Sequence, residues 1–175
     1  MHRMGHWRKA GAAQQDEMVA FVRGNHGEPE VESAVLRNIS TDGLTGLASL
    51  TALSQRLDEI YGHCEALGIS PSSTFALFVM DPDLGQRPAL VRDAVRVLVA
   101  DEAVRTFCHG ETVAISGDRV IVLAALTAGL PRTGLGMVDR LHQLSVLKET
   151  QMMSWIEPLP DERVDISRFV LELAF

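Results

Sequence analysis

The sequence has few cysteines, few aromatic residues and no long hydrophobic run. Cys64 and Cys108 are the only cysteines among 175 residues, which fits a reducing compartment better than a disulfide framework. The longest apolar run covers residues 120–130 and is interrupted by Thr127 and Gly129, so it is too short to cross a bilayer. The N-terminal stretch lacks the apolar core of a signal peptide. These absences predict a cytoplasmic protein without a membrane span.

Basic charge is also scarce. The chain carries 16 Lys and Arg against 23 Asp and Glu, a formal net charge of −7. Nucleic-acid binding needs a concentrated basic surface, so the sequence argues against a nucleic-acid partner. With 46% hydrophobic and 22% charged residues, the composition is that of a globular protein long enough for one domain with a core.

Residues 42–47, Asp-Gly-Leu-Thr-Gly-Leu, are the stretch around which the chain is organised. Gly43 and Gly46 permit backbone angles that other residues avoid, and Asp42 and Thr45 can bond nearby backbone N–H groups and fix a turn. A helix is predicted to follow, because apolar residues recur at helical spacing and a glycine stands at the far end. Its apolar face consists of Leu50, Leu53, Leu57, Ile60, Cys64 and Leu67.

This stretch resembles the opening motif of the GGDEF domains, the diguanylate cyclase family, which reads Asp-x-Leu-Thr-Gly-Leu-x-Asn-Arg. The resemblance implies a single α+β domain over residues 40–175, with an antiparallel-rich central sheet flanked by helices. It also implies that residues 1–39 form a helical N-terminal arm or linker in front of that domain.

Residues 74–80 are apolar on both faces and predict a central, buried strand. The strand ends in Asp81-Pro82-Asp83, where the family has Asp-x-Asp-x-Phe-Lys and uses the first Asp to bind catalytic magnesium. The resemblance therefore implies that Asp81 is a vestigial metal ligand, and carboxylate oxygens suit Mg²⁺. A plain turn is the alternative, since Asp and Pro are common in turns.

The segment that follows departs from the family. There the family has Phe-Lys, Asn-Asp and Gly-His elements, and the Asn and Asp hold the guanine. Here residues 84–93 are fewer and lack all three elements, whereas a purine pocket needs polar groups fixed at its edge. A helix over residues 88–107 is predicted next. Its buried side is marked by Val91, Val95, Leu98, Val99, Ala103 and Phe107.

A β-hairpin is predicted from strands at residues 111–115 and 120–124, joined by a turn at residues 116–119. The family places its signature Gly-Gly-Asp/Glu-Glu-Phe here, and the resemblance makes the third position a metal ligand and the fourth a catalytic Glu. With a one-residue gap, the vestigial signature is Ser116, Gly117, Asp118, Arg119 and Val120. Without the gap, it begins one residue later.

Either register removes an acidic group. With the gap, Asp118 keeps the third position and Arg119 takes the fourth; without it, Arg119 and Val120 stand there. A guanidinium repels Mg²⁺, and two-metal phosphoryl transfer needs several carboxylates. The family's inhibitory product site, Arg-x-x-Asp, is also absent, because its positions hold Cys108 and Glu111. We further expect Arg119 to be mostly exposed at the tip of the hairpin.

The remainder keeps the family pattern. We expect loops at residues 70–73 and 129–134, a third amphipathic helix, a strand at residues 150–156 and a last helix at residues 165–174. The third helix is marked by Met137, Val138, Leu141, Leu144 and Leu147.

The arm carries a narrow apolar stripe of its own. Residues 29–39 favour a helix, on which Val31, Val35 and Ile39 fall on one side. A short isolated helix is marginal in water, so the stripe must pack on its own domain or on a second chain. Because the domain's helices already have enough apolar residues to cover the sheet, we favour a second chain, most simply a symmetric dimer.

The sequence thus predicts a catalytically inactive GGDEF-like signalling or regulatory domain that associates with a protein partner or with its own copy. A non-catalytic sensor of GTP or cyclic di-GMP is the alternative, and a working diguanylate cyclase is a third hypothesis. We assign no catalytic residue, and treat Asp81 and Asp118 as vestigial metal positions. No cofactor is expected, except Mg²⁺ with residual nucleotide binding.

Overall fold

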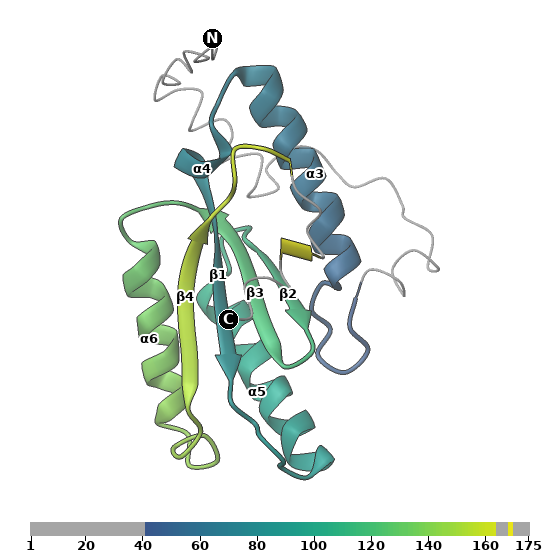
Figure 1. Cartoon of the computed structure of the whole chain (residues 1–175). Helices are drawn as coiled ribbons and strands as arrows, with labels where there is room; N and C mark the ends of the chain where they lie inside the picture. Colours follow the sequence, from purple (N-terminus) through teal and green to yellow (C-terminus); the bar gives the residue numbers. More distant parts are fainter. Residues whose placement is uncertain (1–40, 164–167, 170–175) are drawn as a thin grey trace.

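A computed structural model describes residues 41–163 and 168–169. In chain order the elements are α3 (Leu50–Leu67), α4 (Pro71–Thr74), β1 (Phe75–Pro82), α5 (Ala89–Thr106), β2 (Thr112–Ser116), β3 (Arg119–Ala125), α6 (Leu130–His142) and β4 (Met152–Pro158). The four strands form one antiparallel sheet in the order β2-β3-β1-β4 (Figure 1). The expected α+β class with an antiparallel sheet is confirmed, while the arm lies outside the described residues.

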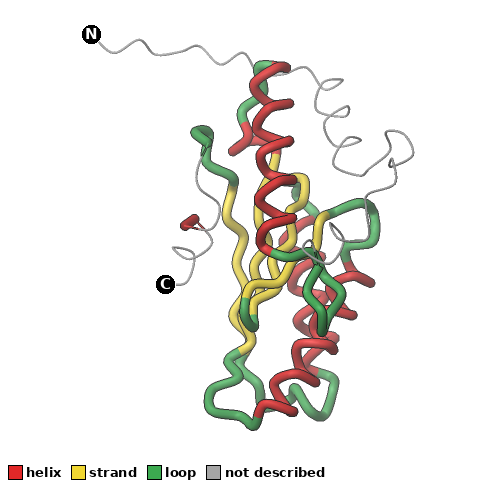
Figure 2. Tube along the Cα trace, turned by 90° about the vertical axis from the view of Figure 1, so that its right-hand side faces the viewer, coloured by secondary structure: helices red, strands yellow, loops and turns green. Residues whose placement is uncertain are grey.

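Helices cover both faces of this sheet, because its central strands are apolar on both sides. Along β1, Phe78 and Met80 face a core shared with α5 and α6. Leu77 and Val79 alternate with them and face a second core shared with α3. Figure 2 shows the strands in the middle of the molecule with helical segments around them. The prediction of a central strand buried on both faces is confirmed.

The helix after the opening stretch has the ends that its sequence indicates. At the start of α3, the Ser49 hydroxyl accepts a hydrogen bond from the Ala52 N–H, and at its end Gly68 adopts φ 65°. A left-handed residue at this position closes a helix, and glycine does so without a steric penalty. The predicted apolar face is largely buried, and Tyr61 is buried with it.

The predicted loop at residues 129–134 is wrong, because α6 begins at Leu130. Pro131 lies in the first turn, where a missing N–H costs no hydrogen bond. Gly134 is inside the helix because α6 approaches β1 closely: a Cβ at this position would lie 2.3 Å from a ring carbon of Phe78. Glycines in this stretch favour a loop by local pattern, but Gly134 is required by the packing against Phe78.

Smaller corrections concern two other segments. The predicted loop at residues 70–73 contains the one-turn helix α4, for which Ser70 is the N-cap. Leu144, assigned to the buried side of the third helix, lies beyond α6 and is exposed, whereas Leu147 in the same turn region is fully buried. The expected last helix lies outside the described residues, apart from residues 168 and 169.

Among the described residues, no helix has both the length and the apolar character that crossing a bilayer would demand.

Candidate functional site

The opening stretch forms the turn that its residues predict. The Asp42 Oδ1 accepts hydrogen bonds from the Leu44 N–H (3.2 Å), the Thr45 N–H (2.8 Å) and the Thr45 hydroxyl (2.7 Å). Gly46 adopts φ 70° and donates its N–H to the Asp42 carbonyl. Burial, the largest influence, raises the pKa of Asp42, but the Thr45 and Leu44 hydrogen bonds and the charge of Arg96 together bring it below its ordinary value.

This turn is attached to the hairpin of β2 and β3. The Ala48 N–H donates to the Val113 carbonyl, and the Ile115 N–H donates to the Ala48 carbonyl. The hairpin itself turns on two residues, Gly117 and Asp118, with Ser116 and Arg119 as the closing pair. The turn falls at the predicted residues 116–119, and its two end residues are already paired as strand residues. Gly117 has φ 62°, and a positive φ at the first central position suits the tight turns of two-residue hairpins.

Arg119 is not exposed at the tip, so that prediction is wrong. It is the first residue of β3, and its Nε donates to the Asp81 Oδ2 at 2.5 Å. Because Val120 is the partner of Met80 in the antiparallel register, Arg119 and Asp81 are neighbours across β3 and β1. The exposed fractions of their side chains are only 23% and 17%.

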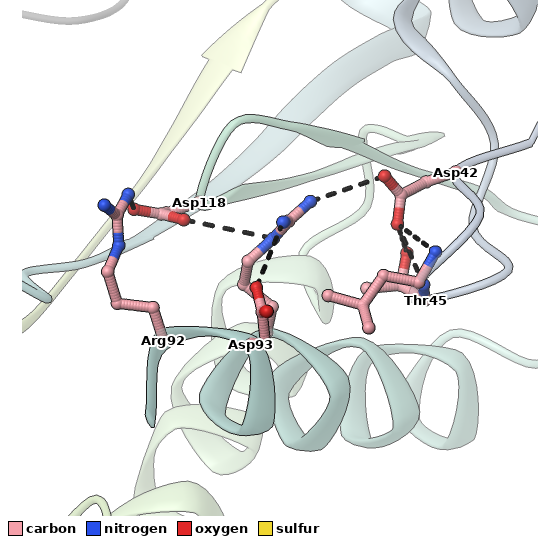
Figure 3. A network of polar contacts seen from close by, with 7 residues as sticks. Asp42, Thr45, Arg92, Asp93 and Asp118 are labelled. Carbon is pink, nitrogen blue, oxygen red and sulfur yellow. Dashed lines mark hydrogen bonds and ion pairs between the residues drawn. The ribbon is translucent and has the colours of Figure 1, made fainter. Parts of the chain in front are cut away.

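The other candidate metal position, Asp118, is also paired with arginines. Its Oδ2 accepts a hydrogen bond from Arg92 Nη2 at 2.6 Å, and its Oδ1 lies 3.9 Å from Arg96 Nε. Arg96 lies 3.3 Å from Asp42 and 3.7 Å from Asp93 as well. Figure 3 shows these carboxylates converging from the opening turn, from α5 and from the hairpin.

Arg96 therefore joins three segments that are far apart in the sequence. Its side chain is only 21% exposed, so its ion pairs are less screened by solvent than those on an open surface. Sequence reasoning did not identify it. The available signal was Arg92, Asp93 and Arg96 within two turns of one helix, a spacing that brings side chains together, but nothing local showed that Asp42 and Asp118 would meet them.

The arrangement is a poor one for a divalent cation. Mg²⁺ requires oxygen ligands with available negative charge, but Asp81 is paired with Arg119, and Asp118 with Arg92 and Arg96. Asp83 is exposed and accepts a hydrogen bond from the Gly85 N–H. No group of three His, Cys, Asp or Glu side chains that could hold a metal occurs in the described part of the chain. As paired here, these residues do not fit a magnesium ion.

A cavity of about 250 Å³ lies at the far end of the hairpin from its turn. It is lined by the end of α5, the end of β3 and the start of α6, and includes His109 and Glu111. The Glu111 carboxylate accepts a hydrogen bond from the His109 N–H at 2.9 Å, and the adjacent Cys108 is exposed. The structure thus places Glu111 in the lining of this cavity and Cys108 next to it in the chain, away from the arginine and aspartate cluster. These are the two positions at which the family's product motif is absent.

Comparison with known proteins finds similarity to solved structures. No family model matches the chain, and no curated protein matches it. The coiled coil and GGDEF domain of DgcB from Caulobacter crescentus, crystallised with c-di-GMP, aligns with a TM-score of 0.65 and 22% identity, covering 91% of this chain and 86% of that one. The diguanylate cyclase SiaD from Pseudomonas aeruginosa, crystallised with its activator SiaC, aligns with a TM-score of 0.58 and 20% identity over 79% of this chain and 56% of that one. The chain therefore has the fold of the GGDEF domains.

Proposed function

We propose that this chain is a GGDEF-like signalling or regulatory domain that has lost cyclase chemistry and works by associating with a protein partner or with its own copy. The observation that carries the proposal is the ion pair between Asp81 and Arg119. In the register with a one-residue gap, it joins the residue at the metal position of β1 to the residue at the position of the catalytic Glu. We expect the protein to work in the cytoplasm.

The physical argument concerns charge. Two-metal phosphoryl transfer uses carboxylates to hold cations against the triphosphate. A guanidinium bonded to Asp81 neutralises that carboxylate, and a metal would have to displace it. The pairing of Asp118 with Arg92 and Arg96 opposes metal binding in the same way. A domain can keep its fold after its metal positions are occupied by internal cations, because fold does not imply function. On this proposal, the domain acts through protein contacts instead.

Association is supported by one structural relative. SiaD, which shares the fold, was crystallised in complex with an activator protein. In the present chain the contact element we propose is the arm stripe of Val31, Val35 and Ile39, which lies outside the described residues.

A non-catalytic sensor of cyclic di-GMP or GTP is the second candidate. It is favoured by the crystal structures of the structural relative DgcB in complex with c-di-GMP. Against it, Cys108 and Glu111 replace the Arg and Asp of the family's product motif, so the charged groups for that ligand differ.

The test measures turnover and binding separately. Purified protein is incubated with GTP and Mg²⁺ or Mn²⁺, and we expect no cyclic di-GMP above background. Product that disappears in the Asp81→Ala variant would refute the loss of cyclase chemistry. Thermal-shift titration with GTP, cyclic di-GMP and Mg²⁺ then separates the two candidates, because a ligand that binds the native state raises the melting temperature. A saturable shift supports the sensor.

A further inference from the structure

The outer side of α5 carries an apolar stripe that none of the described elements covers. Leu90 is 82% exposed, Val97 40% and Val104 47%. These residues are seven apart, close to two helical turns, so they lie along one line on the helix. Ala94 lies between the first two and is also exposed. The core side of α5 is the opposite one, formed by Val95, Val99 and others, and α5 runs along the outside of the molecule (Figures 1 and 2).

The chain enters the domain beside this stripe. The described part begins at residue 41, after 40 residues that lie outside it. Asp42 is held 3.3 Å from Arg96, the residue next to Val97 in the middle of α5. Three residues span at most about 10 Å, so residue 39 is tethered within that distance of Asp42, whose side chain reaches the middle of α5 through Arg96.

The segment 29–39 matches the stripe in chemistry and length. As a helix it would be about 16 Å long, enough to cover the roughly 11 Å of the stripe from Val97 to Leu90. Val31, Val35 and Ile39 would supply its apolar side. Glu28, Glu30 and Glu32 precede or begin it, and the first turn of α5 contains no acidic residue. The positive end of a helix attracts carboxylates, so an arm with residue 39 near Val97 and residue 29 near Leu90 would bring its glutamates to the start of α5.

We propose that residues 29–39 dock on the α5 stripe of their own chain. The preference for a second chain, reached from the sequence, assumed that the domain had no spare apolar surface, and the α5 stripe supplies one. A tethered segment competes at an effective concentration on the order of millimolar, which favours the same chain over a separate copy. The arm stripe that the proposed function assigns to association is then packed on α5. A protein partner must displace it from α5 before it can bind the stripe.

Disulfide trapping in the full chain tests the docking. Cys108→Ser removes the exposed thiol, and the remaining Cys64 is buried. In that background Val35→Cys is combined with Val97→Cys. The matched control combines Val35→Cys with Glu65→Cys, on the exposed side of α3. We expect fast oxidation to a disulfide within one chain for the Val97 pair and slow oxidation for the control. Disulfides that form only between chains, or equally fast in the control, would overturn the proposal.

Limited proteolysis supplies a second readout without cysteines. Trypsin cleavage after Arg37, identified by mass spectrometry, reports how often the arm is released. The double variant Leu90→Asp and Val97→Asp should raise this cleavage rate by roughly tenfold, as expected if docking loses about 1.4 kcal/mol. Leu135→Asp, on the exposed side of α6, should leave it unchanged. Equal rates in the wild type and the double variant would overturn the docking.

These outcomes are separate from those of the proposed function. The α5 stripe is on the side of the helix opposite its core and does not include Asp81, Asp118 or their arginine partners. The double variant is therefore expected to leave the GTP and cyclic di-GMP results unchanged. Trapping between chains would refute docking in the same chain while supporting association, whereas cyclase turnover would refute the loss of chemistry and leave the docking result standing.

Discussion

Arg119 Nε donates to Asp81 Oδ2 across two neighbouring strands, with a separation of 2.5 Å. Both side chains are mostly shielded from water, so each is the main compensation for the other's charge. A buried or half-buried ion pair adds little net stability, but removing one partner leaves an unpaired charge. This relationship joins the first residue of β3 to β1, and on the proposed function it also removes a metal ligand.

Arg119→Ala should destabilise the domain. The variant leaves the Asp81 carboxylate without its partner in a half-buried position, and we expect a loss of ~1–3 kcal/mol in the free energy of unfolding. Urea denaturation at neutral pH measures it. Arg105→Ala is the control, because Arg105 pairs with Asp101 on the surface of α5 and is 70% exposed. That change should cost below about 1 kcal/mol, and an equal loss in both variants would contradict the role given to burial.

Gly134→Ala should destabilise the packing of α6 on the sheet. The new Cβ would lie 2.3 Å from the Phe78 ring, so the ring or the helix must move, at a cost of ~1–3 kcal/mol. Gly136→Ala in the same helix is the matched control, since the nearest atom to its new Cβ would be the flexible end of Arg140, at 3.5 Å. There the better helix propensity of alanine should raise stability by up to ~1 kcal/mol. A stable Gly134 variant with unchanged urea midpoint would show that the close approach is not needed.

The two thiols should react at very different rates. Burial raises the pKa of the Cys64 thiol to about 11, and the thiolate is the reactive form. At pH 8 Cys64 is therefore protonated as well as inaccessible, whereas Cys108 is exposed. A thiol reagent should modify one cysteine quickly in the native protein and both in urea. Fast reaction of two thiols without denaturant would mean that α3 does not seal its core.

Asp161 should make stability depend on pH. Hydrogen bonds from the Ser70 hydroxyl and from Ser72 lower the pKa of Asp161 below its ordinary value of 3.8. Since the folded pKa is depressed, its stabilisation is present above the unfolded pKa and is lost as pH falls through the folded one. Asp161→Asn should therefore lower the unfolding free energy at pH 7, and the difference from wild type should shrink below about pH 4.

Ser70→Ala provides the control for this pair. It removes the strongest donor to Asp161, and the double variant should lose less than the sum of the single variants. A strictly additive loss, or a difference that persists unchanged at low pH, would show that the carboxylate acts elsewhere.

Much of the fold could be read from local sequence. The turn of Asp42 and Thr45, the α3 helix up to Gly68 and the two-sided burial of β1 follow from short-range hydrogen bonding and periodicity, and all are present. The start of α6 could not be read in this way, because Gly134 is explained by the distance to Phe78 on another element.

The sequence by itself determined the class and order of most elements and, in either register of the family's signature, the loss of an acidic position. Only the tertiary structure decided what the remaining charges do. Asp42, Asp93 and Asp118 meet Arg96 because α5 packs beside the hairpin and the opening turn. Asp81 meets Arg119 because of the register of β1 and β3. The partners in these ion pairs are 38 or 54 residues apart in the sequence. Whether they meet depends on which elements pack together, and no local sequence pattern specifies that packing.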